Sequence, residues 1–164
     1  MVGLDPGLTL RWPTLELDVL GPLHPRTHVD PGDGTEVNDT SLVLRAVTPL
    51  GRILLPGDAE ASSQESLLAS GVDLGAEVLK VPHHGSRSSL PAFVTAAHAR
   101  LALVSVGQGN SYGHPSPAMV GLLAGTGALV RRTDQSGDLA LVPAADGGAV
   151  VVARGDPRPD PRRR

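Results

Sequence analysis

Apolar and polar positions alternate near the start of the chain and later give way to longer apolar runs. Residues 8–20 alternate with one break, which predicts two short strands joined at a turn. Residues 41–47 and 51–58 predict a second hairpin, which delivers Asp58 at a strand end. Residues 21–39, between the hairpins, are rich in Pro, Gly, Asp and Thr and therefore favour a long loop.

From residue 59 onward, helical and extended patterns alternate. Helices are predicted at 59–71, 91–99 and 117–127. Strands are predicted at 76–81, 101–107 and 128–134, followed by an antiparallel pair at 137–143 and 148–155. Such alternation is typical of a layered α/β domain. The polar loops follow strand carboxyl ends, where α/β folds collect their chemistry.

Composition bounds the function. A chain of 164 residues, 40% hydrophobic and 19% charged, suits one globular domain, which we assign to residues 1–153. Residues 154–164 are expected to be a disordered charged tail. The net charge of −3 provides no global positive field, so any contact with nucleic acid has to be local. No apolar run reaches the roughly 20 residues that span a bilayer, so this piece is expected to be soluble.

Two strand ends carry the strongest candidates for chemistry. The chain has no cysteine, which leaves His, Asp and Glu as metal ligands. Asp58 follows Gly57 at the end of an apolar strand, although a helix N-cap is the simpler interpretation of Asp58 alone. His83 and His84 follow the next strand; only one of two adjacent side chains can face a shared centre, while the other packs or supports it.

Several further positions have structural interpretations beside functional ones. Ser86, Ser88 and Ser89 favour capping of the helix that begins near Pro91, over anion binding. A glycine-hinged loop at 107–117 places three polar residues together, for each of which loop packing is the simpler interpretation: Asn110, Tyr112 and His114. The only tryptophan and phenylalanine of the chain, Trp12 and Phe93, are expected to be core anchors. His24, His28 and Asp30 show no recognisable ligand spacing, and His98 lies in the helix predicted at 91–99, so a structural role is the simpler interpretation of each.

Five segments in series resemble one known family. They are NDTSLVLR, GRILLPGDAE, LKVPHHGSRSS, LVSVGQGNSYGHPSP and RTDQSGDLAL. Together they resemble the C-terminal metallo-β-lactamase-like domain of ComEC-type DNA-uptake competence proteins, over roughly residues 8 to 142. The resemblance implies an αββα sandwich, of which this chain holds the C-terminal half, and a site for two divalent ions, Zn or Mn. It also implies hydrolysis of phosphodiester bonds in DNA.

The resemblance assigns roles residue by residue. Asp58 resembles the carboxylate that bridges the two metals, and the HHG segment resembles the last histidine ligand, with His84 preferred over His83 because it stands before glycine. Both Asp58 and His84 would then be catalytic. Four residues resemble positions that contact substrate: Ser86, Asn110, Tyr112 and His114.

One departure from the family limits these roles. The main metal motif, HxHxDH, is absent, and the nearest pair is His28 with Asp30. Because hydrolytic metal centres use about three protein ligands per ion, this chain is expected to bind metal weakly and to hydrolyse little. It is thus interpreted as an N-terminally truncated fragment of a membrane-located competence protein, with an uncovered apolar face. DNA and the complementing N-terminal half or membrane portion are the expected partners.

Two other functions stay open. A stand-alone metallohydrolase would act on another ester, and the absence of membrane segments permits it. A non-catalytic remnant, which persists as a binding or structural module, is supported by the absence of HxHxDH. An upstream HxHxDH motif together with membrane segments would indicate the truncated competence protein, the motif alone would favour the soluble hydrolase, and the absence of both would favour the remnant.

Overall fold

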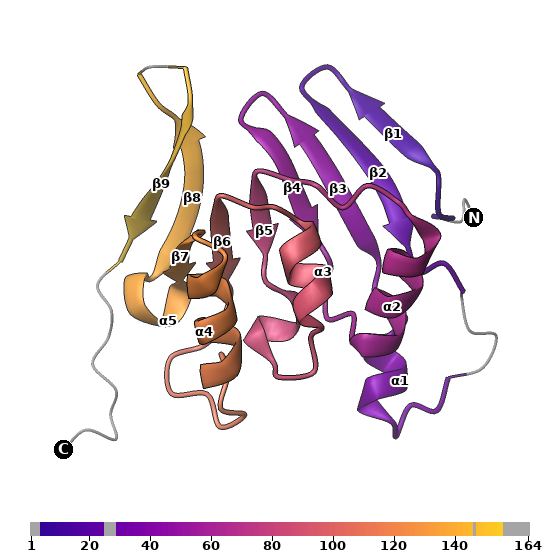
Figure 1. The fold of residues 1–164 in the computed structure, drawn as a ribbon. Helices are drawn as coiled ribbons and strands as arrows, with labels where there is room; N and C mark the ends of the chain where they lie inside the picture. The colour runs from indigo at the N-terminus through magenta and orange to yellow at the C-terminus, as the bar shows by residue number, and fades with distance from the viewer. Residues whose placement is uncertain (1–3, 25–28, 146, 156–164) are drawn as a thin grey trace.

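The protein has one large mixed β-sheet, seen in a computed structural model that describes residues 4–24, 29–145 and 147–155 (Figure 1). The strand order is β1-β2-β3-β4-β5-β6-β7. Strands β1 to β4 are antiparallel, whereas β4 to β7 are parallel. The strands are β1 (Thr9–Trp12), β2 (Leu15–Gly21), β3 (Val43–Thr48), β4 (Gly51–Leu55), β5 (Val78–Lys80), β6 (Leu101–Val104) and β7 (Leu129–Arg132).

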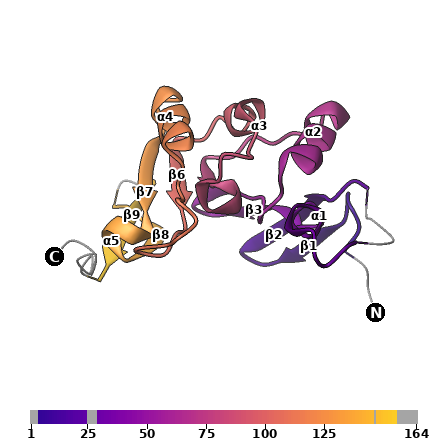
Figure 2. The ribbon, with the colours of Figure 1, turned by 90° about the horizontal axis from the view of Figure 1, so that it is seen from below.

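Three helices cover one face of this sheet (Figure 2). They are the connections between the parallel strands: α2 (Ala61–Ser70), α3 (Pro91–Ala96) and α4 (Pro117–Gly125). Helix α2 ends where predicted, because Gly71 adopts the left-handed conformation, φ 71°, that glycine permits. The α/β fold class predicted from the alternation of elements is confirmed. The architecture is compatible with part of a metallo-β-lactamase-like fold.

The core lies between the sheet and these helices. Its fully buried side chains include Leu54 from β4, Leu79 from β5 and Phe93 from α3. Phe93 is 0% exposed, as expected of a core anchor, but the matching expectation for Trp12 is wrong: it is 53% exposed on the edge strand β1. No layer of the described residues covers Trp12, so the hydrophobic effect has nothing to bury it against.

The helix-free face of the sheet is also apolar. The strand register aligns one row of residues across all seven strands: Leu10, Leu17, Ala46, Ile53, Val78, Leu101 and Leu129. Residues paired in this way point to the same face. The antiparallel hairpin of β8 (Asp138–Pro143) and β9 (Ala149–Arg154) lies against one end of this face, beside β6 and β7. In the described part of the chain, the rest of the row has no second layer.

Three short elements were not predicted. Residues 21–39 were predicted as a loop, but the described part includes α1 (Gly34–Asn38), whose N-cap Asp33 accepts hydrogen bonds from the backbone of Thr35 and Glu36. The others are α5 (Thr133–Ser136) and the 3-10 turn η1 (Pro82–Gly85). Helices this short are fixed by tertiary contacts rather than by periodicity. The predicted tail, residues 154–164, overlaps β9 at its last residue, Arg154. Residues 156–164, like His28, lie outside the described residues.

Candidate functional site at the carboxyl ends of the parallel strands

The predicted site residues meet at one edge of the sheet. Asp58 follows β4, the two histidines follow β5, and the loop at 105–116 follows β6. Because β4, β5 and β6 are parallel neighbours, their carboxyl ends lie side by side. Sequence-distant polar segments are thereby brought into contact.

Asp58 lies between two basic groups. Its Oδ2 is 3.6 Å from Nε2 of His84, and its Oδ1 is 3.6 Å from Nζ of Lys80. The side chain is 37% exposed and does not cap α2. Asp39 supplies the cap instead, since its Oδ1 accepts hydrogen bonds from the backbone N–H groups of Glu60 and Ser63. The start of α2 therefore does not need the carboxylate of Asp58 as a cap.

His84 is oriented by a backbone carbonyl. Its Nδ1 lies 2.6 Å from the carbonyl oxygen of Ser105. A carbonyl only accepts, so Nδ1 carries the proton and donates it. In the neutral ring, Nε2 then presents a lone pair toward Asp58. Histidines that bind metals are commonly oriented in this way, with the N–H of one ring nitrogen donated to a carbonyl and the other nitrogen left to bind the ion.

His83 lies beside Glu60. Its Nδ1 lies 3.1 Å from Oε1 of Glu60, but the geometry does not form a hydrogen bond, so this buried nitrogen has no hydrogen-bond partner in the described part of the chain. Glu60 itself accepts a hydrogen bond from Nδ2 of Asn38. Both histidines have positive φ, 43° for His83 and 54° for His84. This uncommon backbone turns the two adjacent side chains to different neighbours.

The loop after β6 packs on the turn that carries the histidines. The backbone N–H of Ser116 donates to the carbonyl of Gly85, and a Cβ added to Gly85 would lie 2.5 Å from Cβ of Pro115. Only glycine allows this approach. The ring of His114 is edge-on to His83, with 5.5 Å between centroids. Burial lowers the pKa of His114, and the charges of His83, His84 and Arg87 lower it further. The charge of Asp58 raises it.

The serines after the histidines do not cap α3, which corrects the prediction. The hydroxyls of Ser86 and Ser88 lie 3.0 Å apart, and Ser86 is nearly buried. Helix α3 has no side-chain cap at its N-cap, Leu90. Instead, the backbone N–H of Leu90 donates to the side-chain oxygen of the buried Gln64 on α2. A long-range partner therefore binds the N–H of the N-cap residue, and no local serine caps the helix.

Several site residues were missed by the sequence analysis. Lys80 donates a hydrogen bond to the carbonyl of Gly57, which also accepts from the backbone of His83. Burial lowers the pKa of Lys80, whereas Asp58 raises it. The hydroxyl of Ser41 accepts from the backbone N–H of Asp58. One signal was visible, since Lys80 is the only lysine in a chain whose other basic residues are arginines.

Asp58 and His84 can supply two of the ligands of a metal ion. Ligands held at about 2.0–2.2 Å around a tetrahedral ion lie roughly 3.3–3.6 Å apart, which matches the separation of Oδ2 of Asp58 and Nε2 of His84. Within residues 4–24, 29–145 and 147–155, no group of three or more His, Asp or Glu side chains is placed to hold an ion.

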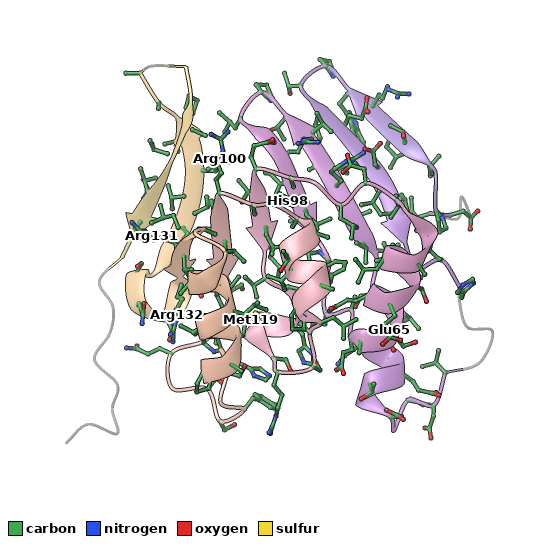
Figure 3. All side chains as sticks on the ribbon, viewed as in Figure 1. Glu65, His98, Arg100, Met119, Arg131 and Arg132 are labelled. Atoms are coloured by element: carbon green, nitrogen blue, oxygen red, sulfur yellow. The ribbon has the colours of Figure 1, made fainter. Side chains whose placement is uncertain are left out.

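Two clefts lie away from these residues. One, of about 710 Å³, separates the hairpin β8–β9 from the helix-free face and is lined by Leu101, Leu129 and Val151. The other, of about 510 Å³, lies around His98 and Arg100, near the amino end of β6 (Figure 3). The polar residues at the strand carboxyl ends therefore form a separate, open site.

The fold and this site define an α/β protein compatible with part of a metallo-β-lactamase-like domain. No protein-family model matches the chain. ComE operon protein 3 of Bacillus subtilis (strain 168) is 33% identical over 134 residues, 81% of this chain and 16% of that protein. Competence protein ComA of Neisseria gonorrhoeae is 34% identical over 131 residues, 79% of this chain and 18% of that protein.

This chain is homologous to a segment of the ComEC-type competence proteins. It is also similar to the uncharacterized protein YcaI of Escherichia coli (strain K12), 34% identical over 88 residues, which are 52% of this chain and 12% of that protein. The chain spans less than a fifth of the length of each of these relatives. In the described residues, none of the helices has both the length and the apolar character needed to cross a membrane. The membrane location of a parent protein, its complementing half and the DNA partner stay predictions.

Proposed function

We propose that this chain takes part in DNA uptake and contributes Asp58 and His84 to a divalent-metal centre that hydrolyses phosphodiester bonds in DNA. The observation that carries the proposal is the geometry of His84. Its proton is held at Nδ1 by the carbonyl of Ser105, and its Nε2 faces Oδ2 of Asp58 at 3.6 Å. Metal binding requires the neutral form of the His84 ring, in which Nε2 carries a lone pair.

The two residues would share the work of the centre. Nε2 of His84 and a carboxylate oxygen of Asp58 would hold an ion, Zn²⁺ or Mn²⁺, of the pair that the family resemblance implies. When bound, such an ion activates water and stabilises charge on a phosphoryl oxygen. Asn110 would contribute indirectly, because its side chain makes hydrogen bonds to both the N–H and the carbonyl of His114 and so shapes the wall of the site.

A second candidate function is a non-catalytic module, and Lys80 is the observation that favours it. Its ammonium lies 3.6 Å from Oδ1 of Asp58 and already provides a counter-charge for that carboxylate. A divalent ion beside Asp58 would be repelled by this ammonium. The pair of Lys80 and Asp58 could therefore persist in a protein that binds no metal.

Metal binding by the isolated chain separates the two functions. Titration of Mn²⁺, followed by the loss of its free electron paramagnetic resonance signal, should show weak saturable binding. Asp58→Asn and His84→Gln should each lower the affinity by at least about tenfold, since each removes a ligand. Lys80→Met should raise the affinity, because it removes the competing charge from beside Asp58.

The matched control is His24→Gln, which changes an exposed histidine that follows β2 and should leave the affinity unchanged. Saturable binding that neither Asp58→Asn nor His84→Gln weakens would place the metal elsewhere and refute the proposal. Complete absence of binding, in the wild type and in Lys80→Met, would favour the non-catalytic module.

A further inference from the structure

Tyr112 is the most exposed large hydrophobic residue in the described part of the chain, at 83%, and it lies on the loop that borders the site. One face of its ring is stacked on His114, with 6.1 Å between centroids and 17° between planes. The other face is open to solvent. An aromatic ring that keeps a flat, free face beside a site for phosphate is the arrangement that binds unpaired bases.

We propose that Tyr112, backed by His114, is a stacking platform for an unpaired nucleobase of single-stranded nucleic acid. This inference rests on the proposed function and narrows its substrate to a strand whose bases are free. In a duplex, the faces of the bases are covered by their stacked neighbours, so the platform has nothing to stack on. Contact with the ring carries no sequence preference, because every base has an aromatic face.

The loop that carries the platform is held in place by its own side chains. Nδ2 of Asn110 donates to the carbonyls of Gly107 and His114, and its Oδ1 accepts from the backbone N–H of His114. At the other end of the loop, the backbone N–H of Ser116 donates a hydrogen bond to the carbonyl of Gly85. A platform fixed in this way loses little conformational entropy when a base stacks on it, and this increases the affinity.

The platform is connected to the site through a series of rings. His114 contacts His83 edge-on at 5.5 Å, and His83 contacts His84 in the same manner at 6.3 Å. A base on Tyr112 would thus be adjacent to the histidines of the proposed centre. The exposed Arg87 lies close enough to act on the charge of His114 and can meet one phosphate of the same strand.

The charge of the chain distinguishes stacking from phosphate binding. With a net charge of −3, the protein has no overall positive field that would hold DNA by its backbone. Binding through one stacked base and one arginine should therefore depend weakly on salt, with a slope of about −0.7 in log affinity against log salt concentration. A protein that neutralises many phosphates gives a much steeper slope.

The test is binding of a short fluorescein-labelled oligothymidylate to the whole chain in EDTA, so that neither hydrolysis nor metal binding contributes. We expect Tyr112→Phe to bind like the wild type, since it keeps the ring. Tyr112→Leu should bind roughly 5- to 150-fold more weakly, the equivalent of about 1–3 kcal/mol for one stacked base. The matched control is Trp12→Leu, which removes the other exposed aromatic side chain, on β1, and should change nothing.

Two further measurements locate the contact. A strand that carries 5-iodouracil should photocross-link to the peptide that contains Tyr112, which is unambiguous because the chain has one tyrosine. A fully duplex oligonucleotide and an abasic strand of the same length should both bind weakly. Circular dichroism and the urea midpoint of each variant verify that the exposed substitution leaves the fold intact.

Several results would overturn the inference: no binding by the wild type, equal binding by Tyr112→Leu, equal binding of the abasic strand, or cross-linking at Trp12. Equal binding of the abasic strand would assign the contact to phosphates. Failure of the metal proposal is distinguishable, because Tyr112-dependent binding in EDTA would then persist without any effect of Asp58→Asn on Mn²⁺ affinity.

Discussion

The contact between Gly85 and Pro115 joins the histidine turn to the loop after β6, and Gly85→Ala tests it. Gly85 has φ 86°, in the left-handed region that costs a residue with a Cβ about 1–2 kcal/mol. The added Cβ would also lie 2.5 Å from Cβ and 3.0 Å from Cα of Pro115. The two segments would have to separate by about 1 Å, which at a packed contact costs about 1–3 kcal/mol.

The expected loss is therefore about 2–5 kcal/mol in the free energy of unfolding. Urea denaturation followed by circular dichroism measures it as a lower midpoint with an unchanged slope. Gly113→Ala is the matched control, because Gly113 has a similar φ of 72° and nothing within 4 Å of its added Cβ. It should lose only the conformational cost, about 1–2 kcal/mol.

The difference between the two variants isolates the contact with Pro115. The imidazole resonances of His83 and His114 should shift in Gly85→Ala, because their 5.5 Å ring contact depends on that junction. A Gly85→Ala protein that is no less stable than Gly113→Ala, with unmoved resonances, would mean that the two loops are not packed together as the structure shows.

Two further predictions concern the support of the site and the opposite end of the sheet. Asp39→Ala should lower the free energy of unfolding by about 2–3 kcal/mol in urea denaturation, since it leaves two N–H groups at the start of α2 unbonded, whereas Asp39→Asn should lose less; equal losses would contradict the capping role. Hydrogen bonds from Arg52 lower the pKa of Glu77 to about 2 from its ordinary 4.5. The ionised Glu77 thus stabilises the fold above pH 4.5, and this contribution is lost as the pH falls toward 2. Glu77→Gln should flatten the pH dependence of stability in that window; an unchanged pH profile would contradict the ion pair.

Much of the fold was predictable from local pattern. The alternation in residues 8–20 corresponds to the hairpin of β1 and β2, and the apolar run at 101–107 contains the buried strand β6. The predicted turn at Gly71 ends α2. These features depend on period and on backbone preference, which neighbouring residues determine.

Both wrong predictions concern residues whose surroundings depend on segments far away in the sequence. Serines near α3 were expected to cap it, but no side chain caps this helix, and Gln64 from another helix accepts a hydrogen bond from the N–H of Leu90, the N-cap residue. Trp12 was expected inside, but nothing in the described part of the chain covers its end of the helix-free face, and it is 53% exposed. The periodicity of a segment indicates which residues prefer burial, and only the packing of other segments determines whether they are buried.

For the candidate site, the sequence alone determined which side chains follow which strands: an aspartate after one, two histidines after the next, and a tyrosine on a hinged loop after a third. Only the tertiary structure decided that Oδ2 of Asp58 faces Nε2 of His84, that His83 turns toward Glu60, and that Lys80 lies beside Asp58. The physical reason is that parallel pairing of β4, β5 and β6 brings together groups that are separated by tens of residues. Their orientation depends on hydrogen bonds, such as that from His84 to Ser105, which form only in the folded chain.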